Sequence, residues 1–370
     1  MASLTALLGL RKPDPTDNVN VTTDISDNME LIDDYFAGRF AVTPGRNAIR
    51  NGDMGVAQRG DGAFTTTDVY TTDGWRKEHI GGTHSITRSA TGMGSGPGLN
   101  GARASLQSVV SGQSAVSEYA RIIHRIESVR TLAGKQVTLS FLAAAGSGTP
   151  KLGISIEQYF GTGGTPSATV DTAIQAITLS TSWTVYSVTF TVPSISGKTL
   201  GTSGNDFLQI CFWYSAGTNF AARASSIGIQ NATIDFTDVQ LEAGSVATAF
   251  ERLPQQVQLA WCQRYFQRFG PGLGLEGWGV GIGINTTQVA VAVPLIVEMR
   301  AVPTLSESSN IRVTDTNVGF NATAHAIDAA RTSRRMAWFT ITTAGTLTAF
   351  RPYTFEASTA AGYFSVSAEL

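Results

Sequence analysis

Short runs in which apolar and polar residues alternate dominate the chain between residues 46 and 250. In residues 136–146, for example, Val137, Leu139 and Phe141 are separated by polar residues, which is the two-residue period of a strand with one buried face. Residues 206–215, "DFLQICFWYS", are apolar on both faces, as expected of a strand buried between two sheets. Turns rich in Gly, Ser and Thr separate the runs, so the pattern predicts one jelly-roll β-sandwich over residues 46–250.

One segment of this region has helical spacing instead. In residues 118–134, Ile122, Ile126 and Val129 recur at intervals of four and three, and Gly134 follows as a stop signal. This spacing predicts a helix that interrupts the strands.

The chain beyond the sandwich is expected to form a connector, residues 251–269, and a second, smaller β domain. Four apolar residues of the connector keep helical spacing: Leu259, Cys262, Phe266 and Phe269. The last part of the connector fits a strand equally well. Residues 270–283 contain too many glycines for a regular element throughout. Alternation returns after residue 284, and it predicts a C-terminal β domain over residues 270–370.

Residues 1–45 predict an arm that carries one short helix. Prolines extend the chain around residues 12–16, and helical spacing follows in residues 24–38. Four apolar residues share one face of that helix: Ile25, Met29, Ile32 and Phe36. A helix this short is marginal in water on its own, so we expect this face to bind a larger particle or other copies of the chain. The predicted fold class is mainly β: an arm with a short helix, a jelly-roll β-sandwich and a smaller C-terminal β domain.

Composition and charge narrow the classes of function. The net charge is −2, so a nucleic-acid partner is not expected, because neutralising phosphates needs clustered Lys and Arg. No apolar run reaches the roughly 18 residues needed to cross a bilayer, so membrane insertion is not expected either. Cys211 and Cys262 both lie in apolar surroundings and are expected to be buried packing residues.

The chemistry-bearing residues form no recognisable catalytic constellation. The four histidines are scattered, and neither a GxSxG motif nor a phosphate-binding loop between a strand and a helix occurs. The sequence also nominates no pair of carboxylates that would face one glycosidic bond. We therefore expect a protein that is not an enzyme and has no catalytic residues or organic cofactor.

Several segments that follow one another along the chain together resemble a widespread group of bacteriophage tail fibre and minor tail proteins. The middle region of these proteins is a carbohydrate-binding-module-like jelly roll. The most specific are "NAIRNGDMGVAQRG" at residues 47–60 and "QLEAGSVATAFERLPQQVQLAWCQRYF" at residues 240–266. The start "LLGLRKPDPTDNVNVTTDISDNMELID", residues 7–33, resembles the particle-anchoring starts of such proteins. One departure is "SFLAAA", residues 140–145, where many relatives carry "SFWAKA", so no ligand contacts are transferred there.

The resemblance implies how the sandwich closes. In a jelly roll the first and last strands lie near each other, so "NGDM", residues 51–54, would enter the sandwich and "DVQLEAG", residues 238–244, would close it. Gly244 would permit the sharp exit, and Phe250 would plug the end of the sandwich.

The resemblance also implies a function. It favours a structural virion protein on the exterior of a phage, a tail fibre or receptor-binding subunit that attaches to host cell-surface glycans. Fibres of this type are commonly homotrimers, and the N-terminal arm would bind other virion tail or capsid proteins. The alternative is a capsid or tail decoration (head fibre) protein without receptor binding, and a glycan depolymerase ranks third.

Two sets of residues are candidates for ligand binding. Trp278, Trp75 and Tyr159 lie near glycine-rich turns and could stack on sugar rings, although packing inside the fold remains the alternative for each. Asp53 and Glu242 would lie near the paired terminal strands, where jelly rolls of the carbohydrate-binding type often hold a structural calcium. Capping or solvation of these two carboxylates is the alternative.

Overall fold

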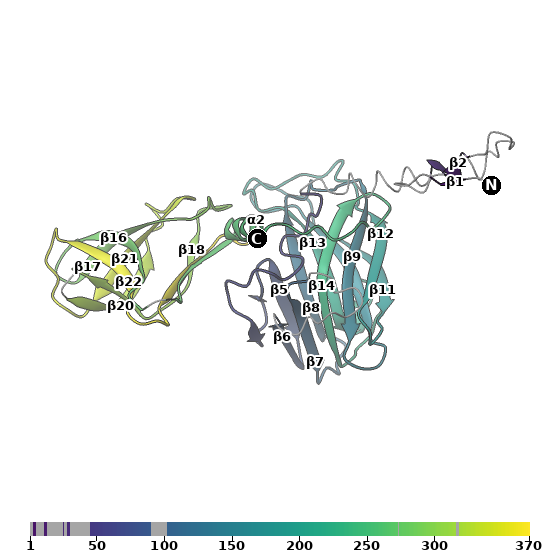
Figure 1. The fold of residues 1–370 in the computed structure, drawn as a ribbon, viewed down its shortest axis with the longest axis horizontal. Helices are drawn as coiled ribbons and strands as arrows, with labels where there is room; N and C mark the ends of the chain where they lie inside the picture. Colours follow the sequence, from purple (N-terminus) through teal and green to yellow (C-terminus); the bar gives the residue numbers. More distant parts are fainter. Residues whose placement is uncertain are drawn as a thin grey trace.

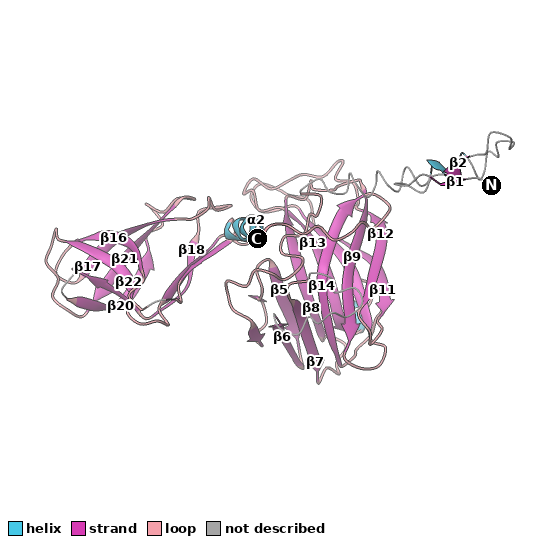
Figure 2. Cartoon of the chain, in the orientation of Figure 1, coloured by secondary structure: helices cyan, strands magenta, loops and turns pink. Residues whose placement is uncertain are grey.

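The computed structural model describes residues 45–89, 102–272, 274–315 and 318–370, and in addition residues 3–4, 11–12, 25 and 28–29. Strands dominate this part of the chain, which confirms the predicted fold class (Figure 2). Figure 1 shows a β-sandwich joined through the helix α2 (Gln255–Gln263) to a second domain built around a barrel. Near the N-terminus, β1 (Ser3–Leu4) pairs with β2 (Arg11–Lys12). No helix among the described residues is long and apolar enough to cross a membrane.

The sandwich consists of two six-stranded antiparallel sheets. The first, called the β13 sheet, has the order β11 (Val170–Thr178), β10 (Lys151–Tyr159), β13 (Phe207–Ala216), β8 (Tyr119–Glu127), β5 (Trp75–Ile80) and β4 (Val69–Tyr70). The second, called the β14 sheet, has the order β12 (Thr184–Thr191), β9 (Gln136–Ala145), β14 (Ala232–Ala243), β7 (Ser105–Ser111), β6 (Thr83–Ser89) and β3 (Gly62–Phe64). Alternate residues of both sheets point inward and form one continuous apolar core.

The strand β13 is buried along its whole length, as its uninterrupted apolar sequence predicts. Its inward residues, such as Ile210 and Phe212, belong to the core between the sheets. On the outer face, Cys211 and Trp213 pack with Ala224 and with other residues of a smaller apolar cluster. A turn that contains the short 3-10 helix η2 (Thr218–Phe220) supplies part of this cover. The prediction of a strand buried on both faces is therefore confirmed.

The opening and closing segments of the sandwich lie side by side, as predicted. The backbone N–H of Ala48 donates to the carbonyl of Leu241, and Val239 N–H donates to the carbonyl of Gly52, both at 2.9 Å. Gly52 is required by this approach, because a Cβ atom there would lie 2.1 Å from the Val239 carbonyl oxygen and 3.2 Å from the Phe250 ring. Gly244 has a φ of +126°, which favours glycine at the exit from β14.

The predicted helix over residues 118–134 is wrong, because residues Tyr119–Glu127 form the strand β8. A separation of four residues satisfies both a helical and a strand period, so Ile122 and Ile126 lie on one face of a strand just as well. The intervening Ile123 faces the opposite side and is also buried, which a helix with one apolar stripe would not explain.

The connector forms both of the elements that its sequence left open. Residues Gln255–Gln263 form α2, and residues Phe266–Phe269 form the strand β15. The expectation of an irregular segment over residues 270–283 is wrong for its second half, where Gly277–Gly283 form the strand β16. Here the glycines allow close pairing, because a Cβ atom at Gly281 would lie 2.2 Å from the Ala290 carbonyl oxygen.

The last domain combines a closed barrel with a three-stranded sheet. The barrel order is β16, β17 (Gln288–Pro294), β21 (Met336–Thr343), β20 (Gly319–Ile327), β19 (Ile311–Thr314) and β22 (Pro352–Ala357). The sheet order is β15, β23 (Tyr363–Ser367) and β18 (Thr304–Ser309). A single apolar core fills both parts, with Phe339, Phe355 and Phe364 in mutual ring contact. Because β15 belongs to this sheet, the connector leads directly into the second core.

His84 makes the sandwich sensitive to acid. Its side chain is buried on β6, and its Nε2 shares a 2.9 Å hydrogen bond with Ser108 Oγ. Burial, followed by the charges of Lys77 and His79, lowers the pKa of His84 to about 3, against about 6.5 in the unfolded chain. Between these two values only the unfolded chain binds the proton, so acidification favours unfolding.

We expect a comparison with the variant His84→Gln to reveal this pH-dependent loss of stability. The stability difference between wild type and variant should be about 2 kcal/mol smaller at pH 5 than at pH 7.5, because only the wild type loses stability through this group. Urea unfolding of both proteins at the two pH values measures the difference. An unchanged gap would show that His84 is not held neutral in the fold.

Candidate functional site

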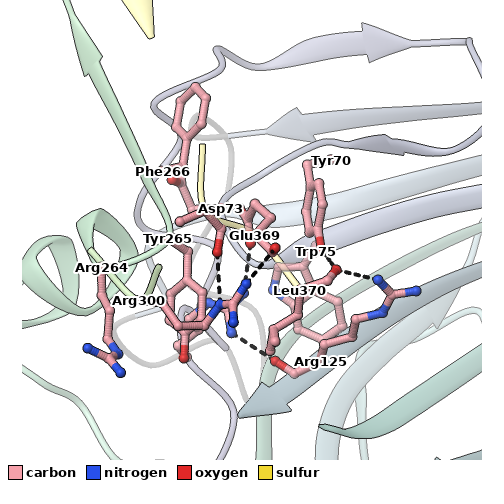
Figure 3. Close-up of polar contacts among 12 residues, drawn as sticks. Tyr70, Asp73, Trp75, Arg125, Arg264, Tyr265, Phe266, Arg300, Glu369 and Leu370 are labelled. Atoms are coloured by element: carbon pink, nitrogen blue, oxygen red, sulfur yellow. Dashed lines mark hydrogen bonds and ion pairs between the residues drawn. The ribbon is translucent and has the colours of Figure 1, made fainter. Parts of the chain in front are cut away.

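The sandwich and the last domain meet in a cluster of charged and aromatic side chains (Figure 3). The segment after β23 reaches the sandwich, where the Glu369 carboxylate lies 3.2 Å from both Arg50 and Arg59. The Tyr70 hydroxyl donates to the Leu370 carbonyl oxygen at 2.8 Å. Arg264, directly after α2, forms an ion pair with Glu127, the last residue of β8, at 2.8 Å. These contacts hold the two domains together and define the walls of two hollows.

The first hollow, called the Tyr159 cleft, has a volume of about 450 Å³. It lies over the outer face of the β13 sheet, where that sheet meets the residues that follow β23. Its lining residues are Arg125, Glu157, Tyr159, Thr169, Asn205, Phe207, Arg300, Glu369 and Leu370. Its size falls within the range of roughly 300–1,000 Å³ that is common for ligand sites.

Strand register builds the aromatic wall of the Tyr159 cleft. Tyr159 ends β10, Phe207 begins β13, and the two residues are direct partners in the antiparallel pairing. Direct partners project to the same face, so the two rings stack with their centroids 4.8 Å apart. Tyr159 is half-buried and Phe207 is buried, which leaves the Tyr159 ring as the accessible part of the wall.

The next row of the same sheet supplies two polar lining residues of the cleft, Arg125 and Glu157, and the Gln209 between them is buried. Arg125, Gln209 and Glu157 are neighbours across β8, β13 and β10. Arg125 Nε donates to Gln209 Oε1 at 2.9 Å, and Gln209 Nε2 lies 3.4 Å from Glu157 Oε2. The arrangement places hydrogen-bond donors and acceptors beside an aromatic face, which suits a polyhydroxylated ligand.

Glu157 and Asp171 form a carboxylate pair that the sequence did not reveal. Arg223 lies between them, with Nη2 3.1 Å from Glu157 Oε2 and 2.7 Å from Asp171 Oδ1. Burial and the neighbouring Asp171 raise the pKa of Glu157. Because one guanidinium binds both carboxylates, the pair is arranged as an ion-pair network around Arg223.

The second hollow, called the Trp261 hollow, has a volume of about 290 Å³ and lies against α2. Trp261 and Tyr265 line it together with Arg50, Glu127 and Arg264. Trp261 is 36% exposed, and sequence reasoning missed it. The sequence could have indicated this exposure, because Trp261 lies outside the apolar stripe of the connector and therefore does not face the core.

A third hollow of about 440 Å³ lies over β9 and β12, where Ser140 and Leu142 are among the lining residues. Ser140, Leu142 and Val185 form its base, and Phe250 closes one side. Its acid, Asp238, pairs with Arg252 at 2.5 Å. Because Arg252 already pairs with Asp238, the third hollow has fewer polar groups available to a ligand than the Tyr159 cleft has.

The structure treats the three predicted sugar-binding aromatics differently. Only Tyr159 lies in a cleft with polar neighbours. The prediction that Trp75 stacks on a sugar ring is wrong, because the side chain is 0% exposed. Its ring contacts Phe212 and Phe236 in the sandwich core. Trp278 is also corrected, because it lies in the strand β16 rather than in a loop.

Trp278 packs into the core of the last domain. Its ring lies edge-on against Phe355 and Phe364, with centroids 5.3 and 5.1 Å away. Trp278 is half-buried, as Tyr159 is, but it lines none of the three hollows described above.

The predicted calcium ligands are engaged by the protein. Asp53 accepts hydrogen bonds from Gln258 and Gly55 and pairs with Arg103 at 3.2 Å. In this pattern the countercharge comes from the Arg103 side chain, and Asp53 Oδ2 has that ion pair but no hydrogen bond. Glu242 is likewise bound by Thr248, Gln240 and Arg46.

The calcium prediction therefore finds no geometric support at these two residues. Across the described ranges, no three His, Cys, Asp or Glu side chains gather in a way that could hold a metal ion.

Half of the predicted particle-binding face falls on residues outside the described part of the chain. Ile25 and Met29 are 47% and 55% exposed. Ile32 and Phe36 lie outside the described residues. The interaction of this face stays a prediction.

Comparison with known proteins gives similarities of fold only. No family model and no curated protein sequence matches the chain. Among solved structures, an enzymatically active domain of tailspike protein 4 from bacteriophage CBA120 is similar over 55% of this chain, with 14% identity and a TM-score of 0.31. The match covers 22% of that tailspike chain.

Two carbohydrate-binding modules are similar to a comparable extent. The xylan-binding CBM22-2 domain of Paenibacillus barcinonensis Xyn10C matches over 50% of this chain and 100% of its own, with 16% identity and a TM-score of 0.31. A family 11 module from Clostridium thermocellum matches over 51% of this chain and 96% of its own, with 12% identity and a TM-score of 0.30. Likenesses this weak carry no argument about function.

Proposed function

We propose that this chain is a non-enzymatic attachment protein of a bacteriophage, a tail fibre or receptor-binding subunit that binds a host-surface glycan in the Tyr159 cleft. The observation that carries the proposal is the accessible Tyr159 ring, stacked on Phe207 beside the polar row of Arg125, Gln209 and Glu157. Sugar rings stack on aromatic faces while their hydroxyl groups bind polar neighbours, and this cleft offers both. The phage context rests on the sequence resemblance described above.

The architecture is compatible with such a subunit. The sandwich carries the cleft, and the barrel lies beyond the junction (Figure 1). Outward-facing apolar residues of the barrel support the further expectation of self-association into a homotrimer: Val280 and Ile282 on β16 are 63% and 50% exposed. The N-terminal arm would connect the trimer to other virion proteins on the outside of the tail.

The proposal predicts that the soluble protein blocks phage adsorption and that Tyr159 contributes to the block. Tyr159→Ala should raise the concentration needed for half-maximal blocking about tenfold, because losing one stacking contact costs about 1.4 kcal/mol. The measurement is a count of adsorbed phage on host cells against the concentration of added purified protein.

The control is Phe350→Ala in the barrel, since Phe350 is 82% exposed and lies away from the cleft. Thermal unfolding should confirm that both variants fold. Absence of blocking by the folded wild type at saturating concentration would sink the attachment function and favour a decoration protein. Blocking that Tyr159→Ala leaves unchanged would show that the receptor binds elsewhere.

A further inference from the structure

We infer that the Trp261 hollow is a second saccharide-binding site, which takes one neutral pyranose unit. This inference goes beyond the proposed function, because it does not depend on binding in the Tyr159 cleft. It follows from three properties of the residues around α2. These are an accessible indole ring, hydrogen-bonding groups that the protein leaves free, and a position beside the cleft on the same face of the β13 sheet.

Trp261 supplies the stacking surface of this site. It lies on α2 and is 36% exposed, whereas Trp75 and Trp213 are 0% and 1% exposed. The second aromatic lining residue, Tyr265, is buried, and the guanidinium carbon of Arg50 lies 3.8 Å from its ring centroid. The indole is therefore the ring that a ligand reaches. The hollow of about 290 Å³ is near the lower end of the roughly 300–1,000 Å³ common for ligand sites, which suits a single ring.

Free hydrogen-bonding groups accompany the indole. Glu127 accepts three hydrogen bonds, from Arg264 Nε at 3.0 Å, from Arg264 Nη2 at 2.8 Å and from the Tyr265 hydroxyl at 2.8 Å. A carboxylate has about four acceptor sites, so one remains. Trp261 Nε1 and Arg264 Nη1 form no hydrogen bond to a described residue. The hollow thus offers two donor atoms and one acceptor site to the hydroxyl groups of a sugar.

The charged residues of the hollow favour a neutral ligand, because each of them already forms an ion pair. Glu127 and Arg264 pair with each other at 2.8 Å, and Arg50 pairs with Glu369 at 3.2 Å. The side chains of Glu127 and Arg264 are nevertheless 38% and 36% exposed, so their remaining hydrogen-bonding positions stay accessible. A pyranose matches this arrangement, since one ring face stacks on the indole while the hydroxyl groups bind the polar neighbours.

The hollow and the Tyr159 cleft lie next to each other. Glu127 pairs with Phe207 in the register of β8 and β13, and Phe207 pairs with Tyr159 in the register of β13 and β10. Direct partners project to the same face of a sheet. Two strand spacings place the backbones of Glu127 and Tyr159 about 10 Å apart. A surface glycan with repeated sugar units can therefore occupy both sites, and the second contact raises the avidity.

The test follows the six tryptophans by fluorine NMR after labelling with 5-fluorotryptophan. Trp261→Phe identifies the Trp261 signal. The probes are the methyl glycosides of glucose, galactose, mannose and N-acetylglucosamine at millimolar concentrations. We expect at least one of them to shift the Trp261 signal along a saturable curve, because pyranoses share the ability to stack. The signals of the buried Trp75 and Trp213 should stay in place.

Variants test the hydrogen bonds and the separation of the two sites. Arg264→Gln should weaken binding of the responding glycoside about threefold or more, because it removes a free donor and the ion pair that orients Glu127. Arg331→Gln is the matched control, since it also breaks an exposed ion pair, with Asp328, and Arg331 does not line the hollow. This control should leave the titration unchanged, and so should Tyr159→Ala.

Cyclohexanol tests the chemical class on the wild type, because it has the size of a pyranose ring and a single hydroxyl group. A Trp261 signal that responds to cyclohexanol as strongly as to the glycosides, or to none of the probes, would overturn the inference. A signal that changes only on dilution of the protein would also overturn it and would assign the hollow to contact with a second copy of the chain. The proposed attachment function has a separate test, the block of phage adsorption, which can fail while the Trp261 titration succeeds.

Discussion

Replacing Trp75 with alanine is expected to lower the free energy of unfolding of the sandwich by about 3–5 kcal/mol. Trp75 is 0% exposed, and its ring centroid lies 4.9 Å from that of His124 and 5.5 Å from that of Phe236. Its Nε1 donates to the Asn51 carbonyl oxygen at 3.0 Å, so the substitution removes a hydrogen bond and opens a cavity together. Denaturant unfolding followed by near-UV circular dichroism measures the loss.

The matched control is Trp261→Ala, which removes the same side chain from a site where it is 36% exposed. This variant should lose less than about 1 kcal/mol, because no closed cavity forms. Trp75→Phe should fall between the two, since it keeps an aromatic ring and loses the hydrogen bond. Similar losses for Trp75→Ala and Trp261→Ala would contradict the buried position of Trp75.

The spacing of apolar residues predicted the strands of the sandwich well where it fitted either a helical or a strand period, but not both. The continuous apolar run at residues 206–215 predicted a strand buried on both faces, and β13 covers residues Phe207–Ala216. Residues 119–127 misled because Ile122 and Ile126 satisfy two periods at once. The glycines of β16 also misled, since their value lies in close pairing with β17, which the segment's own sequence does not contain.

The candidate site was harder to predict because long-range pairing builds it. Tyr159 was found from the sequence as an aromatic residue near a turn. Trp75 and Trp278 met the same description, yet Trp75 is a core residue and Trp278 packs half-buried against the core of the last domain. What distinguishes Tyr159 is its register partner Phe207, 48 residues later in the chain, and the approach of Arg300 from the last domain. Neither relation is encoded in the spacing of nearby residues.

The junction links the stability of the molecule to the shape of the cleft. Glu369 belongs to the ion pairs that hold the domains together, and it also lines the Tyr159 cleft with Leu370. The Tyr70 hydroxyl and Arg125 both donate to the Leu370 carbonyl oxygen. A change that frees this segment should therefore disturb both the domain interface and the ligand site.

Glu369→Gln is expected to cost about 3–5 kcal/mol in the free energy of unfolding, because it removes the carboxylate from the buried Arg50 guanidinium and leaves Arg59 with Asp73, which lies 4.0 Å away. The side chains of Arg50 and Arg59 are each 8% exposed, and that of Glu369 is 7% exposed. The guanidinium carbons lie 3.8 Å from the Tyr265 ring centroid and 3.5 Å from that of Phe266. Denaturant unfolding measures the cost, and faster proteolysis within the connector should report the loosened interface.

Two further variants test whether unpaired buried charge is the cause. Adding Arg50→Met and Arg59→Met to Glu369→Gln should recover part of the lost stability, since apolar side chains can pack on the same aromatic rings. Glu298→Gln, which breaks the pairs of an exposed carboxylate with Arg334 and Arg335, should leave the free energy of unfolding almost unchanged. A triple variant no more stable than Glu369→Gln would assign the loss to the shape of the segment after β23 instead of its charge. In either case saccharide binding should weaken with Glu369→Gln and persist with Glu298→Gln, because only the first substitution releases a wall of the Tyr159 cleft.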